Sequence, residues 1–128
     1  MKFEHTIEVR GNELDAFGHV NNAVYLNYYE QARWVMMQQL GLLEYFEKSG
    51  NFLVVAKADL KFVRELRLLE KVKIISSFKL ESFFVIFDQE IRNTKGEKVN
   101  AARFKCLFVD RQRTPLDVPQ QLLSFTDE

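Results

Sequence analysis

The spacing of hydrophobic residues changes once along the chain, near Gly50. Ahead of it, Phe3 to Arg10 alternates between apolar and polar residues, which predicts a strand. No Pro or Gly interrupts the apolar run from Asn22 to about Leu40, so a long helix is predicted there, and Gly41 stands where a helix is expected to end. A short second helix is predicted over Leu42 to Lys48.

After Gly50, four segments rich in β-branched and aromatic residues predict strands. They are Phe52 to Val63, Lys71 to Lys79, Phe83 to Arg92 and Val99 to Val109. Short links join them, of which Asn93-Thr94-Lys95-Gly96 is the clearest turn. Consecutive strands with no helix between them predict an antiparallel meander. A last helical turn is predicted over Gln120 to Phe125, after Pro115 and Pro119.

The long helix is apolar on nearly all sides, which is typical of a helix surrounded by other structure. The predicted fold is therefore α+β, with a curled antiparallel five-stranded sheet wrapped around a central long helix. At 128 residues the chain is expected to form a single domain over residues 1–128.

Charge and composition narrow the possible partners. Eighteen basic and eighteen acidic residues cancel, so we expect no binding to nucleic acid or to an anionic membrane surface. No apolar run approaches the roughly 20 residues of a membrane span, and Met1 to Thr6 has a strand pattern rather than that of a leader, so a soluble, cytoplasmic protein is expected. Twelve Phe residues predict apolar surface for a partner or a ligand. The single cysteine, Cys106, is expected to be a buried, reduced thiol.

The segment from Asp15 to Asn22 contains the strongest candidate chemistry. A carboxylate precedes a Gly, a His and two Asn directly ahead of the long helix. This order suits attack on a carbonyl, in which Asp15 activates water and N–H groups at the helix start stabilise the oxyanion. Alternatively, Asp15 forms an Asx turn; it lies too early to cap the helix, a role that Asn21 or Asn22 fits better. Packing against an apolar helix is expected to desolvate Asp15 in part and raise its pKa toward that of a general base.

Other catalytic and metal sites find little support. His5 and His19 are the only histidines, and no Cys or carboxylate cluster has ligand spacing, so neither a metal nor a cofactor is expected. A His–Asp pair of His19 with Asp15 is possible by spacing. No serine lies in a Gly-rich elbow, which argues against a Ser-His-Asp hydrolase.

Two groups of charged residues remain open. Glu30 is either a second carboxylate in a pocket or, as is commoner for a helix residue, solvated or paired. Arg33, on the apolar helix, is expected to form a structural ion pair. Four basic residues surround the turn after the second strand and are either solvated or placed to bind a phosphate-bearing ligand. They are Lys61, Arg64, Arg67 and Lys71.

The chain resembles the hotdog-fold acyl-CoA thioesterases of the 4-hydroxybenzoyl-CoA thioesterase type, and most of all the bacterial long-chain acyl-CoA thioesterases. The resemblance rests on Leu14-Asp15-x-x-Gly18-His19-Val20-Asn21-Asn22-x-x-Tyr25-Leu26 followed by Glu30-x-Ala32-Arg33-Trp34. It implies a hotdog fold, with Asp15 as nucleophile or general base and the N–H of Asn22 polarising the thioester carbonyl. It further implies that the remaining motif residues shape the catalytic and substrate site and that Arg64 contacts CoA. Those motif residues are Gly18, His19, Val20, Asn21 and Tyr25.

The sequence departs from that family's pattern in one turn. Arg64-Glu65 stands where family members often have Arg-Pro, and Glu70 occupies the acidic place that opens the third strand. The resemblance implies hydrolysis of a fatty-acyl CoA thioester, of medium to long chain, or of an aryl-acyl CoA thioester, by a homodimer or homotetramer. Two alternatives stay open: a hotdog hydratase or dehydratase, which would use a His–Asp pair, and a non-catalytic module that binds acyl thioesters or proteins.

Overall fold

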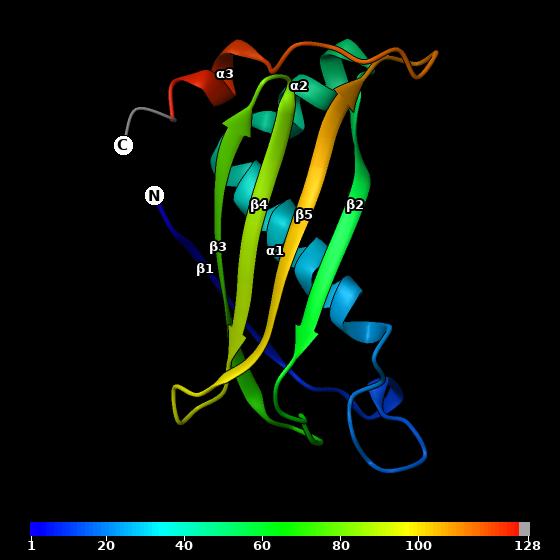
Figure 1. Cartoon of the computed structure of the whole chain (residues 1–128), viewed down its shortest axis with the longest axis vertical. Helices are drawn as coiled ribbons and strands as arrows, with labels where there is room; N and C mark the ends of the chain where they lie inside the picture. Colours follow the sequence, from blue (N-terminus) through cyan, green and yellow to red (C-terminus); the bar gives the residue numbers. More distant parts are fainter. Residues whose placement is uncertain (126–128) are drawn as a thin grey trace.

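The computed structural model describes residues 1–125 and contains one sheet and one long helix (Figure 1). The elements follow the chain in the order β1 (Phe3–Glu8), η1 (Gly11–Glu13), α1 (Val24–Gln39), α2 (Leu42–Ser49), β2 (Phe52–Phe62), β3 (Lys71–Glu81), β4 (Phe84–Arg92), β5 (Lys98–Val109) and α3 (Gln120–Leu123). The predicted order of strand, helix and four strands is confirmed. The last three residues of the predicted domain, 126–128, lie outside the described part.

The five strands form one antiparallel sheet in the order β1-β3-β4-β5-β2. The meander is confirmed for β3, β4 and β5 but is wrong for β2, which pairs with β5 and forms an edge. The cause lies in the link over residues 63–70. Val63 and Arg64 both donate to the carbonyl of Val99, and the buried Leu66 accepts a hydrogen bond from the N–H of Val20. The link therefore crosses the end of the sheet instead of turning directly into β3.

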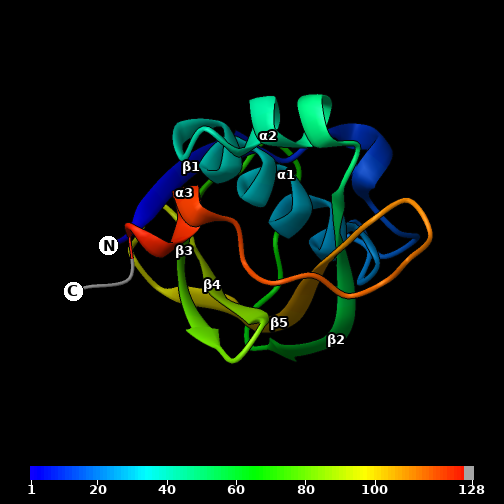
Figure 2. The ribbon, with the colours of Figure 1, turned by 90° about the horizontal axis from the view of Figure 1, so that it is seen from above.

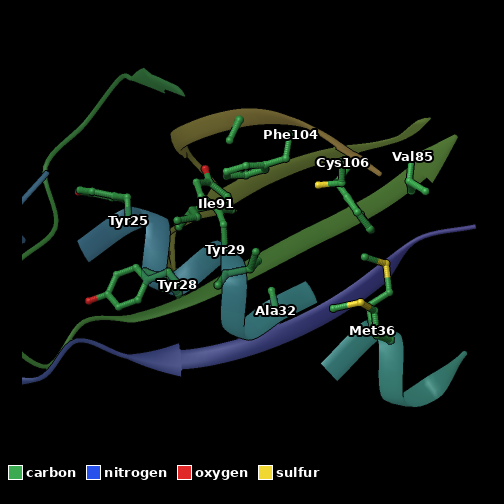
Figure 3. Packing of buried hydrophobic residues seen from close by; sticks show 14 of the residues in the cluster. Tyr25, Tyr28, Tyr29, Ala32, Met36, Val85, Ile91, Phe104 and Cys106 are labelled. Carbon is green, nitrogen blue, oxygen red and sulfur yellow. The ribbon is translucent and has the colours of Figure 1, made fainter. Parts of the chain in front are cut away.

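The sheet curls around α1, as predicted (Figure 2). Tyr29 and Met36 of α1 are fully buried and face the sheet, where the ring of Tyr29 lies 5.6 Å from that of Phe104 (Figure 3). The side of the helix away from the sheet is partly exposed, with Leu26 43% and Trp34 46% exposed, and α2 contacts it through Phe46, whose ring lies 6.4 Å from that of Trp34. The sheet thus covers one face of α1, and the exposed face is mainly polar, with Leu26 and Trp34 as its large apolar residues.

The helix boundaries follow local signals. α1 begins at Val24, two residues after the predicted start, and ends ahead of Gly41, whose φ of 77° is the left-handed conformation that glycine adopts most readily. Cys106 is buried and unpaired, as predicted. Among residues 1–125, no helix is long and apolar enough to cross a membrane.

Candidate active site

The segment between β1 and α1 forms a tight turn that begins at Asp15. The N–H of Asp15 donates to the carbonyl of His19 (2.8 Å), and the N–H of Gly18 donates to the carbonyl of Asp15 (3.1 Å). Gly18 has a φ of 79°, which explains why a glycine stands there. The turn rests on the link after β2, because Val20 donates to the carbonyl of Leu66 (2.9 Å).

The carboxylate of Asp15 closes this turn. Its Oδ1 accepts hydrogen bonds from the N–H groups of Phe17 (2.9 Å) and His19 (3.2 Å), so the Asx turn considered above is present. Oδ2 makes no hydrogen bond within the described chain, and the residue is half-buried. One oxygen therefore holds the turn while the other stays available to a ligand or to water.

The same turn occurs twice more. Asp110 accepts from the N–H groups of Gln112 and Thr114, each at 2.9 Å, and Asn93 accepts from those of Lys95 and Glu97, each at 3.0 Å. An asparagine thus supports the turn as well as an aspartate does. The turn itself does not require the charge of Asp15.

Asn21 and Asn22 have different roles ahead of α1: Asn21 accepts hydrogen bonds, and Asn22 has an N–H that is free within the described chain. The side chain of Asn21 accepts from the N–H of Ala23 (3.0 Å) and its carbonyl accepts from the N–H of Val24 (2.9 Å), so Asn21 closes the turn that precedes α1. The residue directly ahead of α1 is Ala23, whose side chain caps no N–H group, so the helix cap expected at Asn21 or Asn22 is not formed. The N–H of Asn22 has no acceptor among residues 1–125. Because a helix start carries partial positive charge, this N–H can donate to an oxygen that develops negative charge.

A cavity of about 270 Å³ joins this turn to the end of β2. Its lining residues are Asp15, His19, Val20, Asn22, Tyr25, Phe62, Val63, Arg64 and Glu65. Six of the eight predicted site residues are in that set. The other two, Gly18 and Asn21, act on the backbone of the loop and do not line the cavity.

Three residues of this cavity were not predicted from the sequence: Phe62, Val63 and Glu65. Glu65 Oε2 lies 2.9 Å from Nε2 of His19, so the ring of His19 faces Glu65, while Asp15 is bonded only to the backbone of His19. The one sequence feature that pointed to Glu65 was its position, where members of the family often have a proline.

Arg64 and Tyr25 complete the walls. Arg64 is exposed and lies 3.3 Å from Glu97, whose pKa is lowered by a hydrogen bond from Asn93 and by the charge of Arg64. Tyr25 is buried, with its ring 5.4 Å from that of Phe62, and burial raises the pKa of its hydroxyl to about 12. Tyr25 therefore stays neutral near pH 7.

A buried carboxylate, Glu13, supports the loop from behind. Its Oε1 accepts from the N–H of Arg10 and from the hydroxyl of Tyr28, both at 2.7 Å, and its Oε2 accepts from Nε (3.1 Å) and Nη2 (2.8 Å) of Arg10. The carbonyl of Glu13 accepts from the N–H of Asn21 (2.9 Å). Glu13 thereby connects Arg10, which follows β1, with α1 and with the loop that contains Asp15. No local pattern in the sequence predicted this role.

The described residues contain no cluster of three or more His, Cys, Asp or Glu side chains suited to a metal ion. A larger cavity, of about 330 Å³, lies between α1, α2 and β2 and contains Arg33. It holds none of the Asp15 loop, so it is a candidate for binding rather than for chemistry.

Comparison with known proteins points to one family. The model of the thioesterase-like superfamily matches residues 9–125. Acyl-acyl carrier protein thioesterase ATL2 of Arabidopsis thaliana is 30% identical over 127 residues, which cover 95% of this chain and 66% of that protein. This chain thus spans just under two thirds of that relative's length.

Two matches come from Escherichia coli, one among curated proteins and one among solved structures. The long-chain acyl-CoA thioesterase FadM is 32% identical over 73 residues, covering 57% of this chain and 55% of FadM. The crystal structure of the probable thioesterase YbaW superposes with a TM-score of 0.84 and 27% identity, covering 94% of this chain and 93% of YbaW.

Proposed function

This chain belongs to the thioesterase-like superfamily, and we propose that it hydrolyses acyl-CoA thioesters, with medium to long fatty-acyl or aryl-acyl groups, to the free acid and CoA. The observation that carries the proposal is the shared cavity of the Asp15 carboxylate and the Asn22 N–H. A carboxylate and an unpaired N–H in one cavity provide the two groups that attack on a thioester carbonyl needs. The named activity of FadM supports the CoA thioester, whereas that of ATL2, on acyl-carrier-protein thioesters, supports thioester hydrolysis alone.

In the proposed reaction, Asp15 accepts a proton from water as the oxygen of that water attacks the carbonyl carbon. In the nucleophilic variant, Asp15 itself attacks, and water then hydrolyses the resulting anhydride. In both routes the N–H of Asn22 donates to the oxyanion; one such donor contributes about 2.7–4 kcal/mol to the transition state. The C–S bond then breaks, and since a thiol has a pKa of about 8.5, the thiolate leaves without a strong general acid.

The position of His19 argues against a hydratase or dehydratase. Such an enzyme would need the ring of His19 beside Asp15. Instead, Nε2 of His19 faces Glu65 at 2.9 Å, and Asp15 accepts only from the backbone N–H of His19. In the proposed function His19 and Glu65 fix the mouth of the cavity, and Arg64 contacts the CoA phosphates.

The active form in this proposal is a homodimer, or a dimer of such dimers. β2 is an edge strand of 11 residues, with unpaired backbone groups along its outer side. Antiparallel pairing of two β2 strands centred on Ala58 would place Lys57 opposite Asp59 of the second copy, which is a favourable charge pair. The same contact would bring a second copy close to Trp34, which is 46% exposed and lines a cavity with residues of β2.

Thiol release tests the function, with a panel of CoA thioesters from acetyl to palmitoyl plus benzoyl, and matching acyl-carrier-protein thioesters. Asp15→Asn should lower kcat/KM by about 10²–10⁴, the usual contribution of a positioned acid–base group. The fold should be retained, because Asn93 supports the same turn with an amide oxygen.

Asp110→Asn is the matched control. It makes the same chemical change in an equivalent turn outside the cavity, so it should leave thiol release unchanged. If no thioester is cleaved, or if Asp15→Asn is as active as the unchanged protein, the catalytic assignment fails. Binding of acyl-CoA without turnover would then favour the non-catalytic module.

A further inference from the structure

Arg33 is a buried cation without a carboxylate partner. It is only 6% exposed, and no Asp or Glu of residues 1–125 forms an ion pair with it, so the ion pair expected from the sequence is wrong. Its Nη1 donates to Oε1 of Gln89 (3.0 Å), and its guanidinium carbon lies 4.1 Å from the ring centroid of Phe104. Aromatic and amide contacts compensate part of the cost of burying this charge.

The position of the guanidinium is set by a second layer of hydrogen bonds. Nε2 of Gln89 donates to the carbonyl of Tyr29 (3.2 Å) and to Oγ of Ser76 (2.9 Å), which fixes Oε1 as the atom that faces Arg33. Gln89 and Ser76 are both buried. Arg33 is therefore held in place before any ligand arrives, and such preorganisation favours binding.

Arg33 is one of the residues that line the 330 Å³ cavity. The cavity is lined by Glu30, Arg33, Trp34, Met37, Phe46, Phe52, Leu53, Val55 and Cys106. Arg33 uses one of its five N–H groups in a hydrogen bond with the described chain. Glu30 is exposed, and the rest of the lining is apolar apart from the Cys106 thiol. An apolar cavity with one buried, underused cation fits an apolar chain that carries an oxygen atom.

We propose that this cavity receives the distal part of the acyl group and that Arg33 binds an oxygen atom there, so that the substrates are acyl chains with a distal carboxylate, hydroxyl or keto group. This inference rests on the proposed thioesterase function. Charge-assisted hydrogen bonds from arginine to such oxygens are stronger than neutral ones, whereas an unmodified chain end would leave the cation without an acceptor.

The distance along α1 sets the chain length. Both cavities lie between α1 and β2, one with Asn22 and Phe62 in its lining and the other with Arg33 and Val55. Asn22 and Arg33 are eleven positions apart in the sequence, or about 16 Å at about 1.5 Å per residue. An extended chain advances about 1.2 Å per bond, so a chain of about 12 to 14 carbons spans from the carbonyl site to Arg33.

Fluorescence of Trp34, the only tryptophan in the sequence, provides a binding measurement that does not depend on turnover. The probes are S-alkyl CoA thioethers, which are not hydrolysed, have no acyl carbonyl and carry a head too large for the Arg33 cavity: dodecyl-CoA and its analogues whose chain ends in a hydroxyl, a methyl ketone or a carboxylate. At least one oxygenated thioether should bind about 10- to 100-fold more tightly than dodecyl-CoA, the range expected for a charge-assisted hydrogen bond. Arg33→Met should abolish that preference, and Arg33→Lys should keep part of it. Glu30→Gln, which changes only the exposed carboxylate of the lining, should favour the carboxylate-ended probe further.

Thiol release from the corresponding CoA thioesters separates the two proposals. Arg33-dependent preference for an oxygenated thioether without hydrolysis of any thioester would sustain this site and overturn the thioesterase function. Hydrolysis with equal binding of all four thioethers to the unchanged protein would sustain the function and overturn the role of Arg33. That second comparison needs no variant, so it decides the matter even if Arg33→Met does not fold.

Discussion

Replacing Glu13 by Gln tests whether the buried carboxylate stabilises the loop that carries Asp15. A glutamine retains one oxygen that can accept from the N–H of Arg10 and the hydroxyl of Tyr28. Its amide nitrogen, however, would face the Nε and Nη2 donors of Arg10, which lie 3.1 and 2.8 Å from Oε2. Two charge-assisted hydrogen bonds are lost, while the shape of the side chain is preserved.

The expected loss in the free energy of unfolding is about 1.5–3 kcal/mol near pH 7. Hydrogen bonds to charged groups contribute about 1.5–3 kcal/mol each when protected. Here Arg10 is 74% exposed and regains water, which reduces both contributions, whereas Glu13 is 8% exposed and its replacement amide is left without an acceptor. At about 4 °C per kcal/mol for a domain of this size, the melting temperature should fall by about 6–12 °C.

The loss should also depend on pH. Burial alone would raise the pKa of Glu13, but the hydrogen bonds from the Arg10 backbone, from Tyr28 and from the Arg10 side chain together bring it below its ordinary value of 4.5. A group with a lowered pKa in the folded state stabilises the protein above its unfolded pKa and loses that contribution as the pH falls through the folded pKa. The difference between the two proteins should therefore be greatest near neutral pH and shrink below about 4.5.

Urea unfolding of the unchanged protein, Glu13→Gln, Tyr28→Phe and the double variant provides the measurement. Tyr28→Phe removes one hydrogen bond and leaves the contacts of Arg10, so it should cost less and should show coupling with Glu13→Gln. Equal free energies of unfolding for Glu13→Gln and the unchanged protein at neutral pH would refute the reasoning. A difference that stays constant down to about pH 3 would refute the electrostatic part alone.

Two further substitutions test the loop and the rim of the cavity. Gly18→Ala should lower the free energy of unfolding by about 1 kcal/mol, measured in a thermal melt, because φ is 79° although no atom crowds the added methyl. Gly96→Ala, at the same position of the Asn93 turn with a φ of 77°, should lower it as much but leave thiol release unchanged. Equal loss of activity in both would contradict the local role of the Gly18 turn. Arg64→Gln should raise KM for CoA thioesters several-fold with little change in kcat, as a lost phosphate contact of about 1 kcal/mol predicts. Glu97→Gln, which breaks the same ion pair without removing the arginine, should not raise KM, and a rise there would assign the effect to the ion pair.

Most elements of the fold could be predicted because their signals are local. The alternation over β1, the uninterrupted apolar run of α1 and Gly41 at its end each depend on neighbouring residues. The place of β2 could not be predicted in this way, since it depends on hydrogen bonds from the link after β2 to Val99, more than thirty positions later in the chain. Short links favour a meander only when nothing else competes for their backbone groups.

The candidate site, too, was predictable only where its residues are close in the sequence. Asp15 and Asn22 belong to one continuous segment, so their proximity followed from the sequence. Glu65 belongs to the link after β2, and its approach to His19 depends on the packing of two loops. The prediction of a carboxylate partner for Arg33 failed for a different reason. An aromatic ring and the amide of Gln89 can also compensate the cost of burying a guanidinium.

The three equivalent turns separate what the Asp15 motif does for folding from what it adds for chemistry. Asp15, Asn93 and Asp110 use the same pair of backbone hydrogen bonds, so that pair has no catalytic meaning by itself. Of the three, only Asp15 lies in a cavity with an unpaired N–H at the start of a long helix, within the described chain. In the proposed mechanism, function therefore depends on the combination of the turn with Asn22 seven positions later: the turn would orient the carboxylate and the helix start would supply the donor.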